Sequence, residues 1–130
     1  GMIDKTIGDA LMAVFNAPLD LDDHETAAVR CAIEMQENMK ASGLGVEIGV
    51  GCQTGDAVLG NMGSKDRFTY TVIGDSVNQA ARYESATKEV GVNIIVGHET
   101  AINCKYALKS LKPIRVKGKS EPLRIYTYAD

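Results

Sequence analysis

Apolar and polar positions follow two periods along this chain, and each period predicts a different kind of element. Residues 3–15 hold two apolar runs separated by Gly8 and Asp9, a pair that favours a tight hairpin turn. One short helix over the same residues is the alternative. The second run, residues 10–15, is continuously apolar, as in a strand buried on both faces.

The clearest predicted helix covers residues 22–39. Asp22 followed by Glu25 resembles a capping box with Asp in place of Ser or Thr. Small and apolar side chains then recur at helical spacing, at Ala28, Cys31, Ala32, Met35 and Met39. Glycines at positions 43 and 45 are typical of a helix end.

The remaining pattern mixes strands with shorter helices. Strands are predicted over residues 46–52, 57–60, 68–73, 92–96 and 123–128, and helices over 75–87 and, more weakly, 98–106. This mixture predicts an α+β domain over residues 2–130. We expect an antiparallel-rich sheet, with the two longer helices, 22–39 and 75–87, on one face of the sheet. The core is expected to include Ala28, Met35, Ile48, Val50, Val72, Ile95 and Ile125. Gly1, before Met2, looks like a residue left by tag removal.

Composition narrows the class of protein. The chain has 130 residues, of which 45% are apolar and 24% charged, as in a single globular domain. Its net charge of −3 provides no basic field for nucleic acid or an anionic membrane, and no apolar run approaches the ~20 residues of a membrane span. The three cysteines form neither a CxxC pair nor a disulfide framework, which predicts a reducing, cytoplasmic location.

Three groups of residues suggest chemistry. Asp9 at a hairpin tip can offer carboxylate oxygen to Mg²⁺, although Gly-Asp is also simply a favoured turn pair. Asn78 and Arg82 share one helix face and suit a sugar and a polyphosphate, or are a solvated pair beside inward-packing neighbours. The basic run 115–119 can hold phosphate or form a solvated hairpin.

Other catalytic signatures are missing from the sequence. His24 and His98 belong to no acid–nucleophile constellation, and we expect them to be surface or capping residues. The sequence contains no P-loop, no GxGxxG fingerprint and no GxSxG nucleophile elbow.

Taken in order, four segments resemble the catalytic domain of class III adenylyl and guanylyl cyclases. They are residues 5–15 (KTIGDALMAVF), 55–63 (GDAVLGNMG), 70–82 (YTVIGDSVNQAAR) and 116–122 (VKGKSEP). The resemblance implies a nucleotide cyclase fold derived from the ferredoxin-like arrangement. It also implies a homodimer with shared active sites that converts ATP to 3′,5′-cyclic AMP and pyrophosphate with two Mg²⁺ or Mn²⁺ ions.

The resemblance also implies roles for individual residues. Asp9 matches a metal-binding aspartate, Asn78 the ribose-orienting asparagine, Arg82 the transition-state arginine and Lys117 a phosphate-binding lysine. Lys5 and Thr71 match the two base-selecting residues, where guanylyl cyclases typically carry Glu and Cys. Lys5 can donate to adenine N1 and Thr71 can accept from its amino group, whereas guanine reverses this pattern. The pair therefore points to ATP.

One family feature has no counterpart in these residues. Family members begin with a strand bearing Phe-x-Asp-Ile-x-Gly-Phe, which carries the first metal aspartate, and a helix follows it. On this ground we expect negligible cyclase activity from these 130 residues alone, and association of chains through an unpaired strand edge. A non-catalytic pseudo-cyclase and a dimerisation or regulatory module with a cyclase-like fold stay open as alternatives. A diguanylate cyclase is disfavoured because no GG[DE]EF stretch exists.

Overall fold

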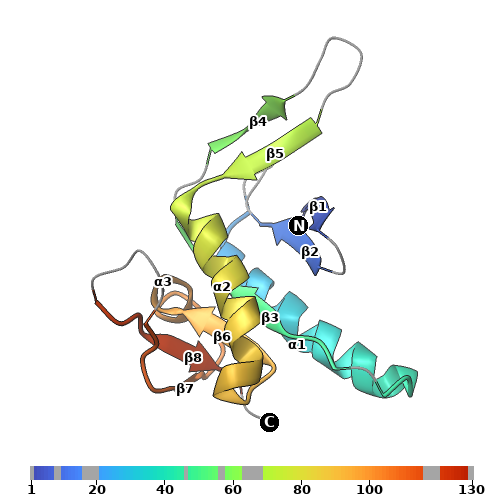
Figure 1. The fold of residues 1–130 in the computed structure, drawn as a ribbon, viewed down its shortest axis with the longest axis vertical. Helices are drawn as coiled ribbons and strands as arrows, with labels where there is room; N and C mark the ends of the chain where they lie inside the picture. Colours follow the sequence, from blue (N-terminus) through green and yellow to red (C-terminus); the bar gives the residue numbers. More distant parts are fainter. Residues whose placement is uncertain are drawn as a thin grey trace.

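The computed structural model describes residues 2–7, 10–15, 21–45, 47–55, 58–62, 69–115 and 121–128 (Figure 1). Its elements in chain order are β1 (Met2–Ile7), β2 (Ala10–Val14), α1 (His24–Ser42), β3 (Val50–Cys52), β4 (Val58–Met62), β5 (Thr69–Ile73), α2 (Asp75–Val90), β6 (Ile94–Gly97), α3 (His98–Ala101), β7 (Lys109–Ser110) and β8 (Ile125–Thr127). None of the helices in these ranges is long and apolar enough to cross a membrane.

A four-stranded sheet in the order β3-β6-β8-β7 forms the centre of the domain. β3 runs parallel to β6, with Val50 opposite Ile94, and the β6–β8 and β8–β7 pairs are antiparallel. The β1–β2 and β4–β5 pairs form two further antiparallel hairpins, and β1 lies against β5. The mixture of helices with mainly antiparallel pairs confirms the predicted α+β class.

The hairpin predicted near the start of the chain is present. Ile7 pairs with Ala10, so Gly8 and Asp9 connect the two strands, although these two residues themselves lie outside the described ones. The single-helix alternative is therefore wrong. The expected burial of β2 on both faces is also wrong, because Ala13 is exposed.

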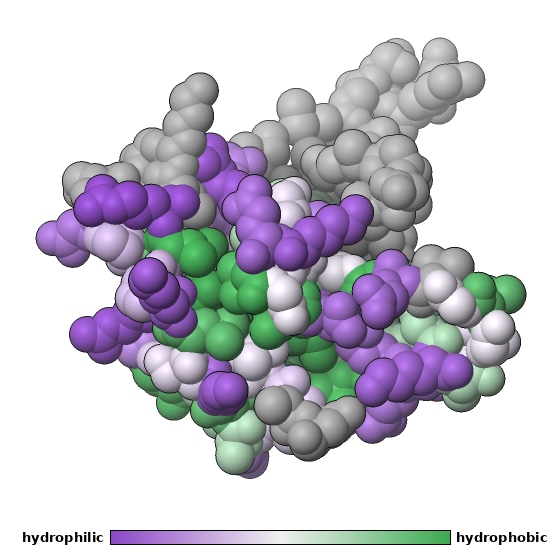
Figure 2. Space-filling model, turned by 60° about the horizontal axis from the view of Figure 1, so that its bottom comes forward, coloured by the Kyte–Doolittle hydropathy of each residue, from purple (hydrophilic) through white to green (hydrophobic). Residues whose placement is uncertain are grey.

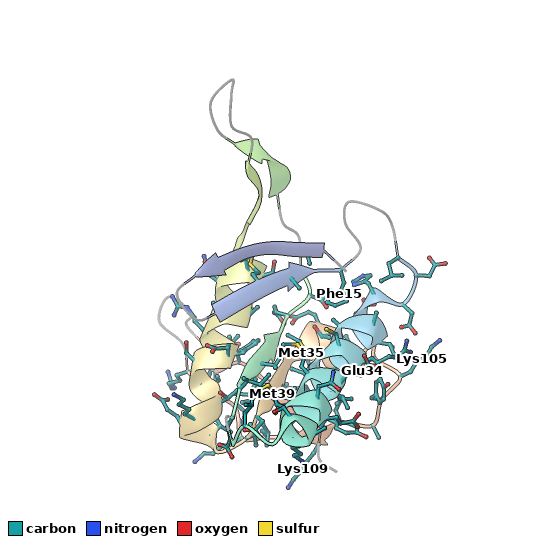
Figure 3. All side chains as sticks on the ribbon, turned by 90° about the vertical axis from the view of Figure 1, so that its right-hand side faces the viewer. Phe15, Glu34, Met35, Met39, Lys105 and Lys109 are labelled. Atoms are coloured by element: carbon teal, nitrogen blue, oxygen red, sulfur yellow. The ribbon has the colours of Figure 1, made fainter. Side chains whose placement is uncertain are left out.

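The two long helices cover opposite faces of the sheet, which corrects the prediction that they share one face (Figure 3). Successive side chains of a strand point to opposite faces. Ile94 and Val96 of β6 pack with Val29 and Ala32 of α1, whereas Ile95 packs with Tyr83 of α2. The short β6 thus contributes to two cores, one under each helix.

α2 packs directly on the backbone of the chain around β3 because glycines leave room for it. A Cβ added at Gly51 would lie 2.3 Å from the carbonyl oxygen of Ala80 and 2.6 Å from the amide nitrogen of Glu84. One added at Gly49 would lie 3.2 Å from the carbonyl oxygen of Glu84. The glycines at these alternate positions therefore leave no side chain between this segment and α2.

Several predicted details differ in the structure. α1 begins at His24 after Asp23, whose φ is 56°, so Asp22 and Glu25 do not form the expected capping box. Asp23 instead accepts a hydrogen bond from Thr26 Oγ1 at 2.8 Å and pairs with Lys105 Nζ at 3.1 Å. Both contacts lower the pKa of Asp23.

Three other elements differ from the prediction. The predicted helix 98–106 ends at Ala101, the predicted strand 46–52 is limited to β3, and the sequence pattern did not predict β7.

Some residues of the predicted core are fully buried, and others are only partly buried. Ile95 and Ile125 are fully buried, whereas four predicted core residues are only half-buried: Ala28, Met35, Ile48 and Val50. The side chain of Val72 lies outside the described ones. At the lower end of the molecule, hydrophobic residues reach the surface between hydrophilic ones (Figure 2).

Replacing Gly51 with Ala tests the close approach of α2. We expect Gly51→Ala to lower the free energy of unfolding by about 2 kcal/mol or more, because the new methyl group meets helix backbone that cannot rotate away. Gly43→Ala is the control: its Cβ meets open space, and only its φ of +69° costs about 1 kcal/mol. Urea unfolding measures both, and a Gly51→Ala loss no larger than that of Gly43→Ala would contradict the packing.

Candidate functional site

The exposed face of α2 carries the most informative polar pair. Asn78 and Arg82 are both exposed, whereas Gln79 and Tyr83, each one position further along, are 9% and 1% exposed. Residues four apart lie one above the other on a helix, so the first pair faces outward while the second faces β3 and β6. The structure thus confirms that Asn78 and Arg82 share one accessible helix face.

Arg82 borders a cavity of about 340 Å³ between α2 and residues 114–115. Ser85 and Glu89 line it from the helix, and Ile114 and Arg115 line it from the other side. Ile114 and Leu123 exchange backbone hydrogen bonds of 3.0 and 2.7 Å, which hold this side as the stem of a hairpin. The cavity is therefore flanked by two guanidinium-bearing residues from segments far apart in the sequence.

Arg115 is the site residue that sequence reasoning did not single out. It lay within the basic run 115–119, for which phosphate binding and a solvated hairpin were both open. The hairpin stem is present, and its Arg115 also faces the cavity beside Arg82. The presence of residues 82 and 115 at one cavity has no local sequence signal, because it depends on how residues 114–115 pack against α2.

The other predicted site residues are placed only by their backbone or lie outside the description. Lys5 belongs to β1 and Thr71 to β5, two strands that contact each other, and neither side chain is described. Asp9 and Lys117 lie outside the described residues. Asp9 belongs to the two-residue connection between β1 and β2, and Lys117 follows Arg115 by two positions.

A polar network lies under the first turns of α2. Gln53, directly after β3, donates through Nε2 to Gln79 Oε1 and to Glu99 Oε2, the latter at 3.1 Å. Gln79 Nε2 in turn donates to Asp75 Oδ2 at 3.1 Å. Burial, reinforced by the carboxylates of Glu99 and Asp75, raises the pKa of Tyr83 to about 12, so this phenol stays neutral at physiological pH.

Among the residues that the structure describes, the remaining candidate ligands do not gather into a metal site. Within the described ranges no group of three His, Cys, Asp or Glu side chains is arranged to hold a metal ion. His98 is partly buried and lies 3.0 Å from the hydroxyl oxygen of Tyr126, so it is more than the surface or capping residue we expected. Burial raises the pKa of Cys52 to about 12, and its thiol therefore has little thiolate character.

Comparison with known proteins identifies the family. Residues 4–129 match the adenylate and guanylate cyclase catalytic domain, and the chain belongs to this family. Adenylate cyclase 1 of Rhizobium meliloti is 35% identical over 136 residues, which cover 97% of this chain and 20% of that protein. The adenylate cyclase of Anabaena cylindrica is 36% identical over 143 residues, covering 97% of this chain and 28% of that protein. The chain thus spans a minor part of the length of these curated relatives.

Solved structures confirm the cyclase fold. The adenylyl cyclase CyaB from P. aeruginosa superposes with a TM-score of 0.84 at 34% identity, covering 100% of this chain and 72% of that one. The guanylyl cyclase Cya2 superposes with a TM-score of 0.79 at 32% identity, covering 97% and 68%. Because proteins described as adenylyl and as guanylyl cyclases are both this similar, overall similarity does not select the nucleotide base.

The exposure pattern on α2 predicts which substitutions disturb folding. Tyr83→Ala is expected to lower the free energy of unfolding by roughly 3 kcal/mol or more, because it empties a buried site between two elements. Asn78→Ala and Arg82→Ala are expected to change it by less than about 1 kcal/mol, since exposed side chains contribute little. Denaturant titrations of the three variants check this, and a loss at Asn78 as large as that at Tyr83 would contradict the assignment of faces.

Proposed function

We propose that residues 2–130 act as an adenylate cyclase domain, which converts ATP to 3′,5′-cyclic AMP and pyrophosphate. The observation that carries the proposal is the accessible pair Asn78 and Arg82 on α2. An exposed amide and guanidinium contribute little to folding, so their placement together suits a ligand with hydroxyl and phosphate groups. Membership of the cyclase family supplies the reaction class.

The reaction is an in-line displacement at the α-phosphorus. The ribose 3′-oxygen attacks, the bond to the β-phosphate oxygen breaks, pyrophosphate leaves, and the hydroxyl proton passes to solvent. We assign Asn78 to orient the ribose and Arg82 to donate forked hydrogen bonds to phosphate oxygens as their negative charge shifts. Lys117, two positions beyond the cavity-lining Arg115, is assigned to the phosphates as well.

We further propose that Lys5 and Thr71 select adenine. The contact between β1 and β5 supports this assignment, because it brings the strands that carry both residues together. Lys5 has only donors and can meet adenine N1, while the Thr71 hydroxyl can accept from the adenine amino group.

A homodimer that shares its active sites is proposed from the family pattern. A cytoplasmic location is proposed because the three cysteines are free thiols.

The proposed metal ligand in this chain is Asp9. The Ile7–Ala10 pair makes residues 8–9 the hairpin tip, and Mg²⁺ or Mn²⁺ is commonly held by one or two carboxylates together with substrate phosphates. When bound, such an ion polarises phosphate oxygens and lowers the pKa of a nearby hydroxyl. Asp9 fits this role as one carboxylate.

A cyclic AMP assay tests the proposal. With ATP and Mn²⁺ we expect product formation from a form extended by the codons upstream of Met2, and negligible product from residues 1–130 alone. Arg82→Ala should lower kcat by about 10²-fold or more, because it removes a donor to the transition state. Arg30→Ala, on α1 across the sheet, removes an exposed arginine of the same kind and should leave kcat within about twofold. Absence of cyclic AMP from both forms would overturn the function.

Base selection gives a second test. The active form should turn over ATP in preference to GTP, and Lys5→Glu should lower ATP turnover by about 10²-fold or more, since a carboxylate cannot donate to adenine N1. Lys109→Glu makes the same charge reversal at an exposed position on β7 and should keep the preference for ATP. Equal turnover of the two nucleotides by the wild type would contradict the assignment of Lys5 and Thr71.

A further inference from the structure

The amide network under α2 joins three elements at one point. Gln53 follows β3, Gln79 lies on the inner face of α2, and Glu99 lies in α3. Gln79 then extends the network to Asp75 in the first turn of its own helix. The start of α2 is therefore tied by hydrogen bonds to the residue that follows β3 and, through it, to α3.

The orientation of both amides is fixed by their partners. Gln53 Nε2 faces two acceptors, Gln79 Oε1 and the carboxylate of Glu99, so a reversed amide would place oxygen against oxygen. Gln79 Nε2 likewise faces the carboxylate of Asp75. Each glutamine therefore has one amide orientation that keeps these hydrogen bonds.

The network leaves one polar atom without a partner. Gln53 Oε1 is buried and accepts no hydrogen bond from the described residues, and it lies so close to Gly97 that a Cβ added there would be 1.8 Å away. A buried acceptor without a donor is costly, and an apolar side chain would avoid the cost. An amide at this position therefore requires a reason other than filling space.

The exposed residues next to this network on α2 provide a reason for an amide at position 53. Gln79 directly follows Asn78, and Tyr83 directly follows Arg82. The rotation of α2 about its axis that buries Gln79 and Tyr83 therefore also sets the direction in which the two exposed side chains point. Gly51 and Tyr83 fix the middle of the helix against the sheet. Gly74, at the N-cap position, has no side chain to hold the first turn, and the Gln53–Gln79 hydrogen bond lies where that support is needed.

We propose that Gln79, held by Gln53, is a positioning residue that orients Asn78 and Arg82 for the cyclase reaction. The proposal rests on the proposed function. Productive geometry generally has to be held within about 0.5 Å and 10–20°. Without the glutamine pair, α2 keeps the apolar packing of Tyr83, but its first turns lose the polar contacts that fix their rotation.

The test compares three glutamine variants. Gln79→Leu and Gln53→Leu each remove one end of the hydrogen bond between the two amides. Gln36→Leu is the matched control: its Nε2 donates to the carbonyl oxygens of Ile48 at 2.9 Å and Asn93 at 3.2 Å, from α1 on the other face of the sheet. All three substitutions remove two or more hydrogen bonds from one side chain, so loss of stability alone does not separate them.

Two measurements separate positioning from folding. Amide hydrogen exchange should rise in residues 75–83 for Gln79→Leu and Gln53→Leu, and should not rise there for Gln36→Leu. In the cyclase-active form, kcat should fall at least about tenfold for both α2-network variants, with KM for ATP within about twofold. The double variant should lose no more than either single one, because both act through the same hydrogen bond.

The outcomes are distinct. Unchanged exchange in residues 75–83, or faster exchange with unchanged kcat, overturns the positioning role while the wild-type cyclase activity stands. A kcat loss for Gln36→Leu equal to that for Gln79→Leu assigns the effect to general destabilisation and also overturns it. An extended wild-type form that makes no cyclic AMP overturns the proposed function, and the positioning role is overturned with it.

Discussion

The direct contact of the α2 backbone with the chain around β3 is the constraint on which the rest of the domain depends. A helix and a strand approach this closely only where the strand presents glycine, and Gly49 and Gly51 do so at alternate positions. The approach buries Tyr83 against β6 and turns the helix face that carries Asn78 and Arg82 outward. The other face of the same strands is left to α1, so one short sheet has two separate apolar cores (Figures 1 and 3).

Local patterns predicted most elements but not how they pack. The hairpin at Gly8 and Asp9, the helix that carries Asn78 and Arg82, and the α+β class all follow from periodicity and turn residues. The placement of the two helices on opposite faces does not, because it depends on the alternation of Ile94, Ile95 and Val96 within a fully buried strand. A run that is apolar at every position gives no sign of which residue meets which helix.

In the candidate site too, residues within one continuous motif could be predicted from the sequence, whereas a residue brought in by packing could not. The motif around Asn78 is continuous in the sequence and was predicted, whereas Arg115 reaches the cavity only through the packing of a distant hairpin stem. The lining of this cavity combines two guanidinium groups, from Arg82 and Arg115, with the carboxylate of Glu89.

The separation of exposed and buried faces on α2 also affects how such a domain can change over generations. Because Asn78 and Arg82 lie outside both cores, a gene copy that lost them would still encode a folded and abundant protein. Selection for folding alone would preserve Gly51 and Tyr83 and ignore the exposed pair. Loss of the exposed pair would leave both buried cores intact, so stability measurements alone would not reveal such a change.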